Sequence, residues 1–209
     1  MNRLQKSIDN RKIFKYIPKY IIKKYIKCNP NKNYELGYIY QFYYKNYELM
    51  HQYYNKAIDE GNSKAMKNLG YYYQCTEKNY DLMKTYYLDA IALGNSIAMY
   101  DLGWYYEDIE NNYDLMKKYY ADAIELGKTC AMNNLGIYYQ YTEKNYDLMK
   151  QYYLMAIALG DIYAMTNLGY YYKNIEKNYN LMKKYLMMAI KLGCKYAYMY
   201  LISYYKNVV

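Results

Sequence analysis

Apolar residues recur along the chain with the spacing of amphipathic helices, in pairs of segments separated by short polar stretches. Ala65, Leu69, Gly70 and Tyr73 fall on one helical face, because they follow one another at offsets of four, five and eight residues. After a polar turn around residues 75–78, a second stripe comprises Met83, Tyr86, Tyr87, Ala90 and Ile91. No segment shows a competing strand pattern. The pattern predicts an all-α chain of helix-turn-helix units, each with a first helix (helix A) and a second helix (helix B).

The pattern returns every 33 residues without gaps. A period of this length is typical of stacked arrays, in which each unit buries its apolar face against the next. Several columns keep the step: Leu36-Gly37, Leu69-Gly70, Leu102-Gly103, Leu135-Gly136 and Leu168-Gly169; Gly61, Gly94, Gly127, Gly160 and Gly193; Ala65, Ala98, Ala131, Ala164 and Ala197; and Leu-Met pairs from Leu49-Met50 to Leu181-Met182. The chain therefore contains about five repeats and a terminal half-repeat.

Two kinds of position in each repeat predict local geometry. Asn79 fits the N-cap of helix B, and Asp81 complements the helix dipole in the first turn. Gly94 suits a left-handed residue at the end of helix B. Gly70 lies within helix A, where glycine costs about 1 kcal/mol relative to alanine, so its recurrence predicts a close helix crossing. The capping asparagine recurs at Asn46, Asn112, Asn145 and Asn178.

The repeat resembles the Sel1-like repeat, a relative of the tetratricopeptide repeat with the pattern A-x3-L-G-x2-Y, a loop, and a helix ending A-A-x2-G. Here these parts read Ala98-Met99-Tyr100-Asp101-Leu102-Gly103-Trp104-Tyr105-Tyr106 and Ala123-Ile124-Glu125-Leu126-Gly127. The loop is shortened to Glu143-Lys144-Asn145-Tyr146, and Ile replaces the second Ala at Ile91 and Ile157. The resemblance covers residues 32–209 and implies a right-handed α-solenoid with helix A on its concave face. The Tyr- and Asn-rich composition is similar to that of repeat arrays from large DNA viruses.

The two ends of the chain depart from the repeat. Residues 1–31 form a basic segment with a predicted capping helix, in which Pro18 suits the first turn and the sequence Asn29-Pro30-Asn31 stops the helix. At the other end, Ile202 and Ser203 replace the glycine and the aromatic residue of helix A, so this helix is also predicted to cap the array. The apolar stripe of the N-terminal helix is Ile17, Tyr20, Ile21, Ile22, Tyr25 and Ile26.

Composition and charge narrow the classes of partner. The chain has 40 Tyr against 2 Phe and 1 Trp, and we expect these tyrosines to fill the core with their hydroxyls reaching water or backbone. Residues 1–32 hold ten basic residues and one acidic residue, which is a net charge of +9, whereas the remaining chain has 18 of each sign. Attraction to nucleic acid or to an anionic membrane is therefore expected only from residues 1–32.

The cysteines and the hydropathy pattern point to an intracellular protein. Cys28, Cys75, Cys130 and Cys194 are widely spaced, with neither a zinc-binding nor a disulfide pattern, so we expect free thiols in a reducing compartment, with the cytoplasm favoured. No apolar run is long enough to span a membrane. The start of the chain lacks the apolar region and cleavage site of a signal peptide.

Little in the sequence indicates catalysis. The single histidine, His51, occupies the column of Lys84, Lys117 and Lys150, so we expect it to be exposed on the surface. One histidine gives no triad and no repeated metal motif. The glycines fit caps and crossings rather than a phosphate-binding loop. The sequence predicts a non-enzymatic protein without cofactor or metal.

Columns that vary among repeats indicate a surface free to specialise. Tyr72, Tyr105, Tyr138 and Tyr171 hardly vary and are assigned to packing. The variable positions of helix A are predicted to line the concave face and to bind a protein partner, as aromatic anchors with a polar rim. These predicted partner-binding residues are Tyr38, Lys67, Tyr71, Gln74, Tyr100, Trp104, Glu107, Asn133, Ile137, Gln140, Tyr170 and Lys173.

The predicted function is therefore that of a protein-protein interaction scaffold or adaptor, which holds a peptide or a helix along the concave face. The alternative is a binder of nucleic acid or of an anionic membrane surface, working through residues 1–32, in which Lys19, Lys23, Lys24 and Lys27 contact phosphates.

Overall fold

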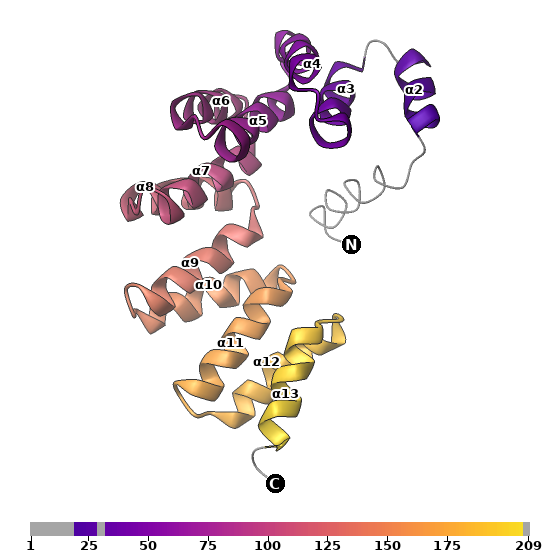
Figure 1. Ribbon diagram of the computed structural model, residues 1–209. Coiled ribbons are helices and arrows are strands. Elements are labelled where there is room, and N and C mark those ends of the chain that lie inside the picture. Colours follow the sequence, from indigo (N-terminus) through magenta and orange to yellow (C-terminus); the bar gives the residue numbers. More distant parts are fainter. Residues whose placement is uncertain (1–18, 29–31, 207–209) are drawn as a thin grey trace. The chain divides into compact units, whose positions relative to one another are not determined.

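The computed structural model describes residues 19–28 and 32–206, which form helices joined by short turns (Figure 1). No strand occurs in either of these ranges. This confirms the predicted all-α class. The helices are α2 (Lys19–Cys28), α3 (Asn33–Ile39), η1 (Tyr40–Tyr44), α4 (Tyr47–Asp59), α5 (Ser63–Tyr72), η2 (Tyr73–Glu77), α6 (Tyr80–Ala92), α7 (Ser96–Asp108), α8 (Tyr113–Glu125), α9 (Thr129–Tyr141), α10 (Tyr146–Ala158), α11 (Ile162–Asn174), α12 (Tyr179–Lys191) and α13 (Lys195–Lys206).

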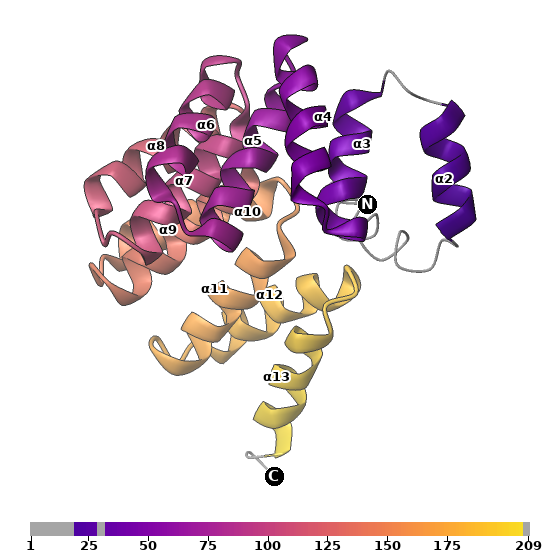
Figure 2. The same ribbon diagram turned by 45° about the horizontal axis from the view of Figure 1, so that its top comes forward.

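The chain forms two compact units, Met1–Asp101 and Leu102–Val209, and the boundary falls within α7. In the first unit, α3 and α5 are the A helices and α4 and α6 are the B helices, and Figure 2 shows these four in sequence order. In the second unit, the end of α7 with α9, α11 and α13 supplies the A helices, and α8, α10 and α12 are the B helices. Helix B contacts helix A of its own repeat and helix A of the next, as α10 contacts α9 and α11. Each repeat therefore buries its apolar face against its neighbour, as the period predicted.

The predicted caps of helix B are present in every repeat. The Asn79 side chain accepts a hydrogen bond from the backbone N–H of Leu82, and the four equivalent asparagines make the same bond. This bond satisfies one of the N–H groups that the first turn of a helix leaves without an intrahelical partner. At the other end of helix B, Gly94 has a φ of +71°, a left-handed conformation that glycine adopts without steric cost.

The glycine within helix A marks the predicted close crossing. A Cβ on Gly136 would lie 2.4 Å from Cε1 of Tyr153, and a Cβ on Gly70 would lie 2.5 Å from Cδ1 of Tyr87. In the fifth repeat the residue opposite Gly169 is Leu186 rather than tyrosine. Glycine at this position lets a large side chain of helix B lie against the backbone of helix A.

The fully buried tyrosines of helix B, Tyr54, Tyr87, Tyr120 and Tyr153, bond to side chains, so for them the expectation that the hydroxyls reach water or backbone is wrong. The hydroxyl of Tyr54 donates to Oε1 of Gln41 at 2.7 Å and accepts from Nδ2 of Asn68 at 3.0 Å. These partners come from helix A of the same repeat and helix A of the next. A buried hydroxyl without a partner would be unfavourable, and a polar position on each flanking helix provides one.

A second column of buried tyrosines bonds to the loop that follows helix A. The hydroxyl of Tyr138 donates to Glu143 at 2.8 Å, and that of Tyr72 donates to Glu77 at 2.6 Å. The assignment of this column to packing is confirmed, because its members are buried: Tyr72, Tyr105, Tyr138 and Tyr171.

The polar turn predicted at residues 75–78 is shorter than expected. The chain continues from α5 into a turn of π-helix, η2, which ends at Glu77, and Lys78 then reverses the chain direction with a φ of 54°. The backbone N–H of Asn79 closes this turn on the carbonyl of Tyr73 at 3.0 Å. Hydrophobic periodicity could not reveal the π-turn, because it reports which side chains share a face and not whether a backbone N–H bonds to the carbonyl four or five residues earlier.

The predicted N-terminal helix is present as α2, which begins directly after Pro18 and ends directly before Asn29. Ile22 is buried, but Tyr20 and Ile21, which were assigned to the apolar stripe, are exposed. Ile17, Pro18 and the stop sequence 29–31 lie outside the described residues, as does the rest of the basic segment up to residue 18.

Candidate functional site

The second unit carries exposed apolar side chains at one repeated position of helix A. Trp104 on α7 is 40% exposed and Tyr170 on α11 is 38% exposed. Ile137, at the same position of α9, is half-buried. The structure therefore leaves these three predicted residues accessible, and we call them the helix A strip.

Two further tyrosines extend the apolar surface beside Tyr170. The rings of Tyr170 and Tyr200 have centroids 5.5 Å apart. Burial raises the pKa of Tyr141, and the nearby phenols of Tyr170 and Tyr200 raise it further, which places these groups close together. Tyr200 was absent from the predicted set, because α13 was interpreted only as a cap. A 33-residue comparison could have found it, since Tyr200 follows Asn167 in a column that is otherwise polar.

In the first unit, the corresponding surface is aromatic and more closely packed. The rings of Tyr38 and Phe42 are 4.6 Å apart, and Phe42 and Tyr71 are 6.5 Å apart. The Lys67 ammonium lies 5.6 Å from the centre of the Tyr71 ring and 3.8 Å from a carboxylate oxygen of Asp101. Tyr38, Lys67, Tyr71 and Tyr100 are all half-buried.

Three residues assigned to the polar rim are buried instead. Gln74 and Gln140 accept hydrogen bonds from Tyr87 and Tyr153 at 2.8 Å, and Asn133 accepts one from Asn167 at 3.0 Å. These positions face a neighbouring helix, because helix A is covered by helix B of its own repeat and also contacts the next repeat. A role in partner binding remains only a prediction for them, and their burial opposes it.

Glu107 and Lys173 occupy the column of those glutamines but differ in environment. Glu107 accepts a hydrogen bond from the Tyr120 hydroxyl at 2.7 Å, and burial raises the pKa of its carboxyl. Lys173 is half-buried and faces a repeat in which Leu186 replaces the hydroxyl-bearing tyrosine. In this repeat no tyrosine hydroxyl needs an acceptor at position 173, because Leu186 stands in its place. A lysine is therefore tolerated there.

His51 is half-buried rather than exposed. Its ring lies 5.2 Å from that of Tyr72 in an edge-on arrangement, and burial lowers the pKa of its imidazole. At the equivalent position of a later repeat, Lys117 lies 5.6 Å from the ring centre of Tyr138 and 3.1 Å from Glu143. The column is therefore a packing position against the buried tyrosine of helix A, Tyr72 or Tyr138. The imidazole of His51 makes the contact that a lysine makes in the later repeats.

Within residues 19–28 and 32–206, no group of three or more His, Cys, Asp or Glu side chains is placed to hold a metal ion. All four cysteines are free thiols. No helix in these ranges is long and apolar enough to cross a membrane. The structure thus shows no metal centre in the part of the chain that it describes.

The basic N-terminal segment is described only in part. Lys23, Lys24 and Lys27 are exposed on α2, and Lys32 lies 5.9 Å from the ring centre of Tyr25. Binding of nucleic acid or of an anionic membrane through residues 1–32 stays a prediction, because most of this segment lies outside the described residues.

Comparison with known proteins shows that solved structures share this architecture, although no sequence match is found. No family model matches the sequence, and no curated protein matches it. Among solved structures, a protective antigen of uropathogenic Escherichia coli strains with an SLR fold superposes with a TM-score of 0.62 at 24% identity, over 79% of this chain and 38% of that protein. This chain therefore spans well under half the length of that relative.

Two further structures cover most of the chain. A Sel1 repeat protein from Oxalobacter formigenes has a TM-score of 0.62 at 22% identity, over 87% of this chain and 79% of its own. An immunity protein from Pseudomonas aeruginosa has a TM-score of 0.58 at 22% identity, over 78% and 67% of the two chains. With the repeat period, the glycine crossings and the capped B helices, these similarities show that the chain has the Sel1-like repeat fold.

Proposed function

We propose that this protein is a non-enzymatic interaction scaffold that binds a peptide or a helix of another protein along the helix A strip. The observation that supports it best is the exposure of Trp104 and Tyr170, with Ile137 at the same position of the intervening repeat. Stacked helical repeats present extended surfaces of this kind, and each repeat contributes one row of side chains. A linear ligand can then contact several repeats in turn.

The chemistry of the strip favours a protein ligand. Tryptophan and tyrosine are enriched among the residues that dominate binding energy at protein interfaces. Their rings are rigid and combine apolar surface with a polar group, so they bind apolar side chains without a large loss of conformational entropy. Tyr141 and Tyr200 place further aromatic surface beside Tyr170. The ligand is therefore expected to insert apolar side chains among these rings.

The acidic groups with shifted pKa values do not suggest catalysis. Glu107 and Glu143 each accept a hydrogen bond from a buried tyrosine of the repeat framework, Tyr120 and Tyr138. Perturbed pKa values can mark a catalytic site, but structural networks perturb them as well. Here burial raises the pKa of Glu107, and the hydrogen bond from Tyr138 lowers the pKa of Glu143. Both causes arise from packing within a repeat, which supports the assignment of a scaffold.

The strip can be tested by affinity capture from the native cell, with the triple variant Trp104→Ala, Ile137→Ala, Tyr170→Ala beside the wild type. The matched control is Leu154→Ala, Met187→Ala, because both side chains are exposed on B helices of the same unit. We expect specific partners to be lost from the triple variant and kept by the control. The same set of partners from both variants, with both folded by circular dichroism, would refute the proposal.

A second readout uses the only tryptophan of the chain. Because Trp104 is 40% exposed, its fluorescence should shift to shorter wavelength and become less accessible to acrylamide when a captured partner covers the strip. An unchanged emission spectrum at saturating partner would place the binding site elsewhere.

A further inference from the structure

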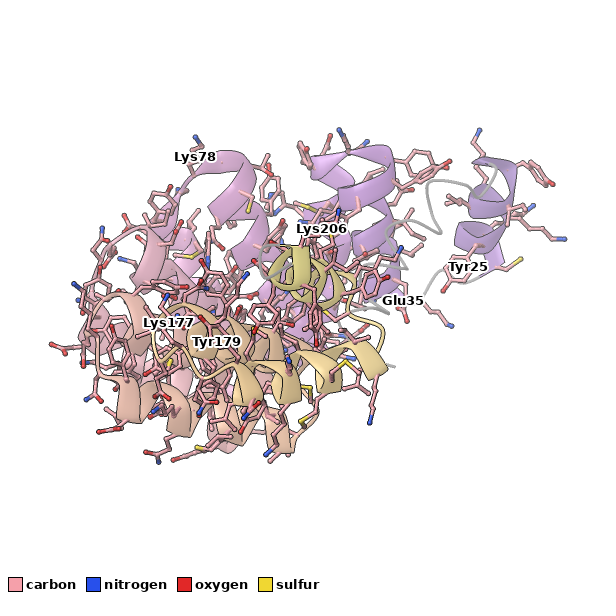
Figure 3. All side chains as sticks on the ribbon, turned by 90° about the horizontal axis from the view of Figure 1, so that it is seen from below. Tyr25, Glu35, Lys78, Lys177, Tyr179 and Lys206 are labelled. Atoms are coloured by element: carbon pink, nitrogen blue, oxygen red, sulfur yellow. The ribbon has the colours of Figure 1, made fainter. Side chains whose placement is uncertain are left out.

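The helix A strip lies on α7, α9 and α11, and the last two of these helices carry almost no charge. No residue of α9 is charged, and α11 contains only Lys173, next to its last residue. The neighbouring helix B differs, since α8 alone has two lysines and three acidic residues. Lys177, labelled in Figure 3, lies beyond α11 in the turn that precedes α12. The middle of the strip is therefore matched to an uncharged ligand.

The aromatic side chains beside the strip carry unused hydrogen-bond donors. Tyr141 follows Ile137 by four residues and Tyr163 precedes Tyr170 by seven, so both share the face of the strip. Tyr141 and Tyr163 are 59% and 66% exposed. Neither their hydroxyls, nor that of Tyr170, nor the indole N–H of Trp104 bonds to another residue within the described ranges. An indole N–H can only donate, so this face suits a ligand that offers acceptors.

Three of these rings form an angled cluster. The rings of Tyr170 and Tyr200 have centroids 5.5 Å apart and are inclined at 54°, and the phenol of Tyr141 lies close to both. Tyr170 and Tyr200 are each 38% exposed. Inclined rings do not cover each other's faces as stacked rings would, so an apolar group of a ligand can pack on them. The pyrrolidine ring of proline packs in this way on aromatic-lined surfaces.

The spacing of the A helices matches the pitch of an extended proline-rich chain. Successive A helices touch, as α9 touches α11 and α11 touches α13, and packed helices lie about 8–10 Å apart. A polyproline II helix has three residues per turn and rises about 3.1 Å per residue, so every third side chain lies on one face at intervals of about 9 Å. One proline for each A helix therefore stays in register with the repeats.

Other linear ligands fit these observations less well. An α-helix uses its own carbonyls internally, so it would cover the hydroxyls and the indole N–H without offering them backbone acceptors. A β-strand turns alternate side chains away from the surface that it lies on. Nucleic acid requires cations, whereas α7 presents Glu107 and Asp108 beyond Trp104.

We propose that the helix A strip binds an uncharged, proline-rich segment of another protein in the polyproline II conformation, with proline at every third position; this inference rests on the proposed function. One proline packs on the rings of Tyr141 and Tyr170, and its neighbours in the register pack on Ile137 and Trp104. The hydroxyls and the indole N–H donate to carbonyls of the ligand. Proline supplies a carbonyl but no N–H, and its preformed backbone loses little conformational entropy on binding.

The test measures fluorescence anisotropy of the full chain with three fluorescein-labelled, uncharged peptides of equal length. The first has four prolines at every third position, the second has four prolines at every fourth position, and the third has glycine in place of each proline of the first. We expect the first peptide to bind at least about tenfold more tightly than the other two. Its affinity should not change with salt, because no charge pair is formed.

Variants of the protein locate the binding and test the donors. Trp104→Ala and Tyr170→Ala should each weaken binding of the first peptide by more than about tenfold. Tyr170→Phe keeps the ring and loses only the hydroxyl, so it should weaken binding by about two- to tenfold. Leu154→Ala, at an exposed position of α10, should bind like the wild type. Far-UV circular dichroism confirms that each variant is folded.

The proposal is wrong if none of the peptides binds, if the three bind equally, or if the Trp104 and Tyr170 variants bind like the wild type. It is also wrong if a helical peptide of Leu and Ala displaces the first peptide and binds more tightly. Affinity capture distinguishes this failure from that of the proposed function. Partners lost from the triple variant, without binding of the first peptide, would keep the strip as a protein-binding site and exclude the proline-rich ligand, whereas retained partners would refute the strip itself.

Discussion

Substitution of alanine for Gly136 tests the packing on which the whole array depends. The added Cβ would lie 2.4 Å from Cε1 and 2.5 Å from Cδ1 of Tyr153, which is about 1 Å or more inside the normal contact distance between carbon atoms of about 3.5–4.0 Å. The ring of Tyr153 is fully buried, and its hydroxyl donates to Gln140 at 2.8 Å. The ring can therefore retreat only by disturbing its neighbours and lengthening this hydrogen bond.

The expected magnitude follows from three opposing effects. Overpacking of a core costs about 1–3 kcal/mol, and weakening of a buried hydrogen bond costs about 1 kcal/mol. Alanine is favoured over glycine within a helix by about 0.8–1.0 kcal/mol, which offsets part of this cost. We expect Gly136→Ala to lower the free energy of unfolding by about 1–3 kcal/mol, measured as a reduced urea midpoint by far-UV circular dichroism.

Gly169 supplies the matched control. The atoms opposite it are Cδ2 and Cγ of Leu186, both 2.9 Å from the added Cβ, and an aliphatic side chain can change rotamer more easily than a ring held by its hydroxyl. Gly169→Ala should therefore cost less than Gly136→Ala. A Gly136→Ala protein as stable as the wild type, or equal losses at the two glycines, would show that the tyrosine ring does not determine the choice of glycine.

Three further changes test other parts of the repeat by urea unfolding. Asn145→Ala removes the cap on the Leu148 N–H and should cost about 1 kcal/mol; no loss would mean that the bond forms equally well with water. Gly160→Ala should cost about 1–2 kcal/mol despite open space around it, because φ is +80° there; an unchanged midpoint would contradict the left-handed geometry. Burial raises the pKa of Glu107, whose ionised form therefore destabilises the fold above its pKa. Glu107→Gln, which can still accept from Tyr120, should stabilise the protein at neutral pH, and the gain should shrink as pH falls through the carboxyl range; a pH-independent difference would refute this.

Features set by a few neighbouring residues could be predicted from the sequence. Asn145 caps helix B because its side chain reaches an N–H group three residues along the chain, and Gly160 is left-handed because it ends a helix. The crossing at Gly136 is a tertiary feature, but its signal was local, since glycine within a helix is unfavourable unless a neighbour requires it. Because the pattern recurs every 33 residues, each of these assignments could be extended to all repeats.

Only the tertiary structure decided which of the variable side chains of helix A are buried and which are exposed. Gln140 and Trp104 both vary among repeats, yet Gln140 is buried and holds the hydroxyl of Tyr153, 13 residues away, whereas Trp104 is exposed. Helical periodicity identifies one packed face, but helix A contacts both its own helix B and the adjacent repeats, so a second face is covered as well. Likewise, Tyr205 has the sequence of a buried stacking residue and is exposed because the described chain provides no helix to cover it. Burial of a side chain depends on which segments lie beside it in space, and the periodicity of a single helix does not specify those segments.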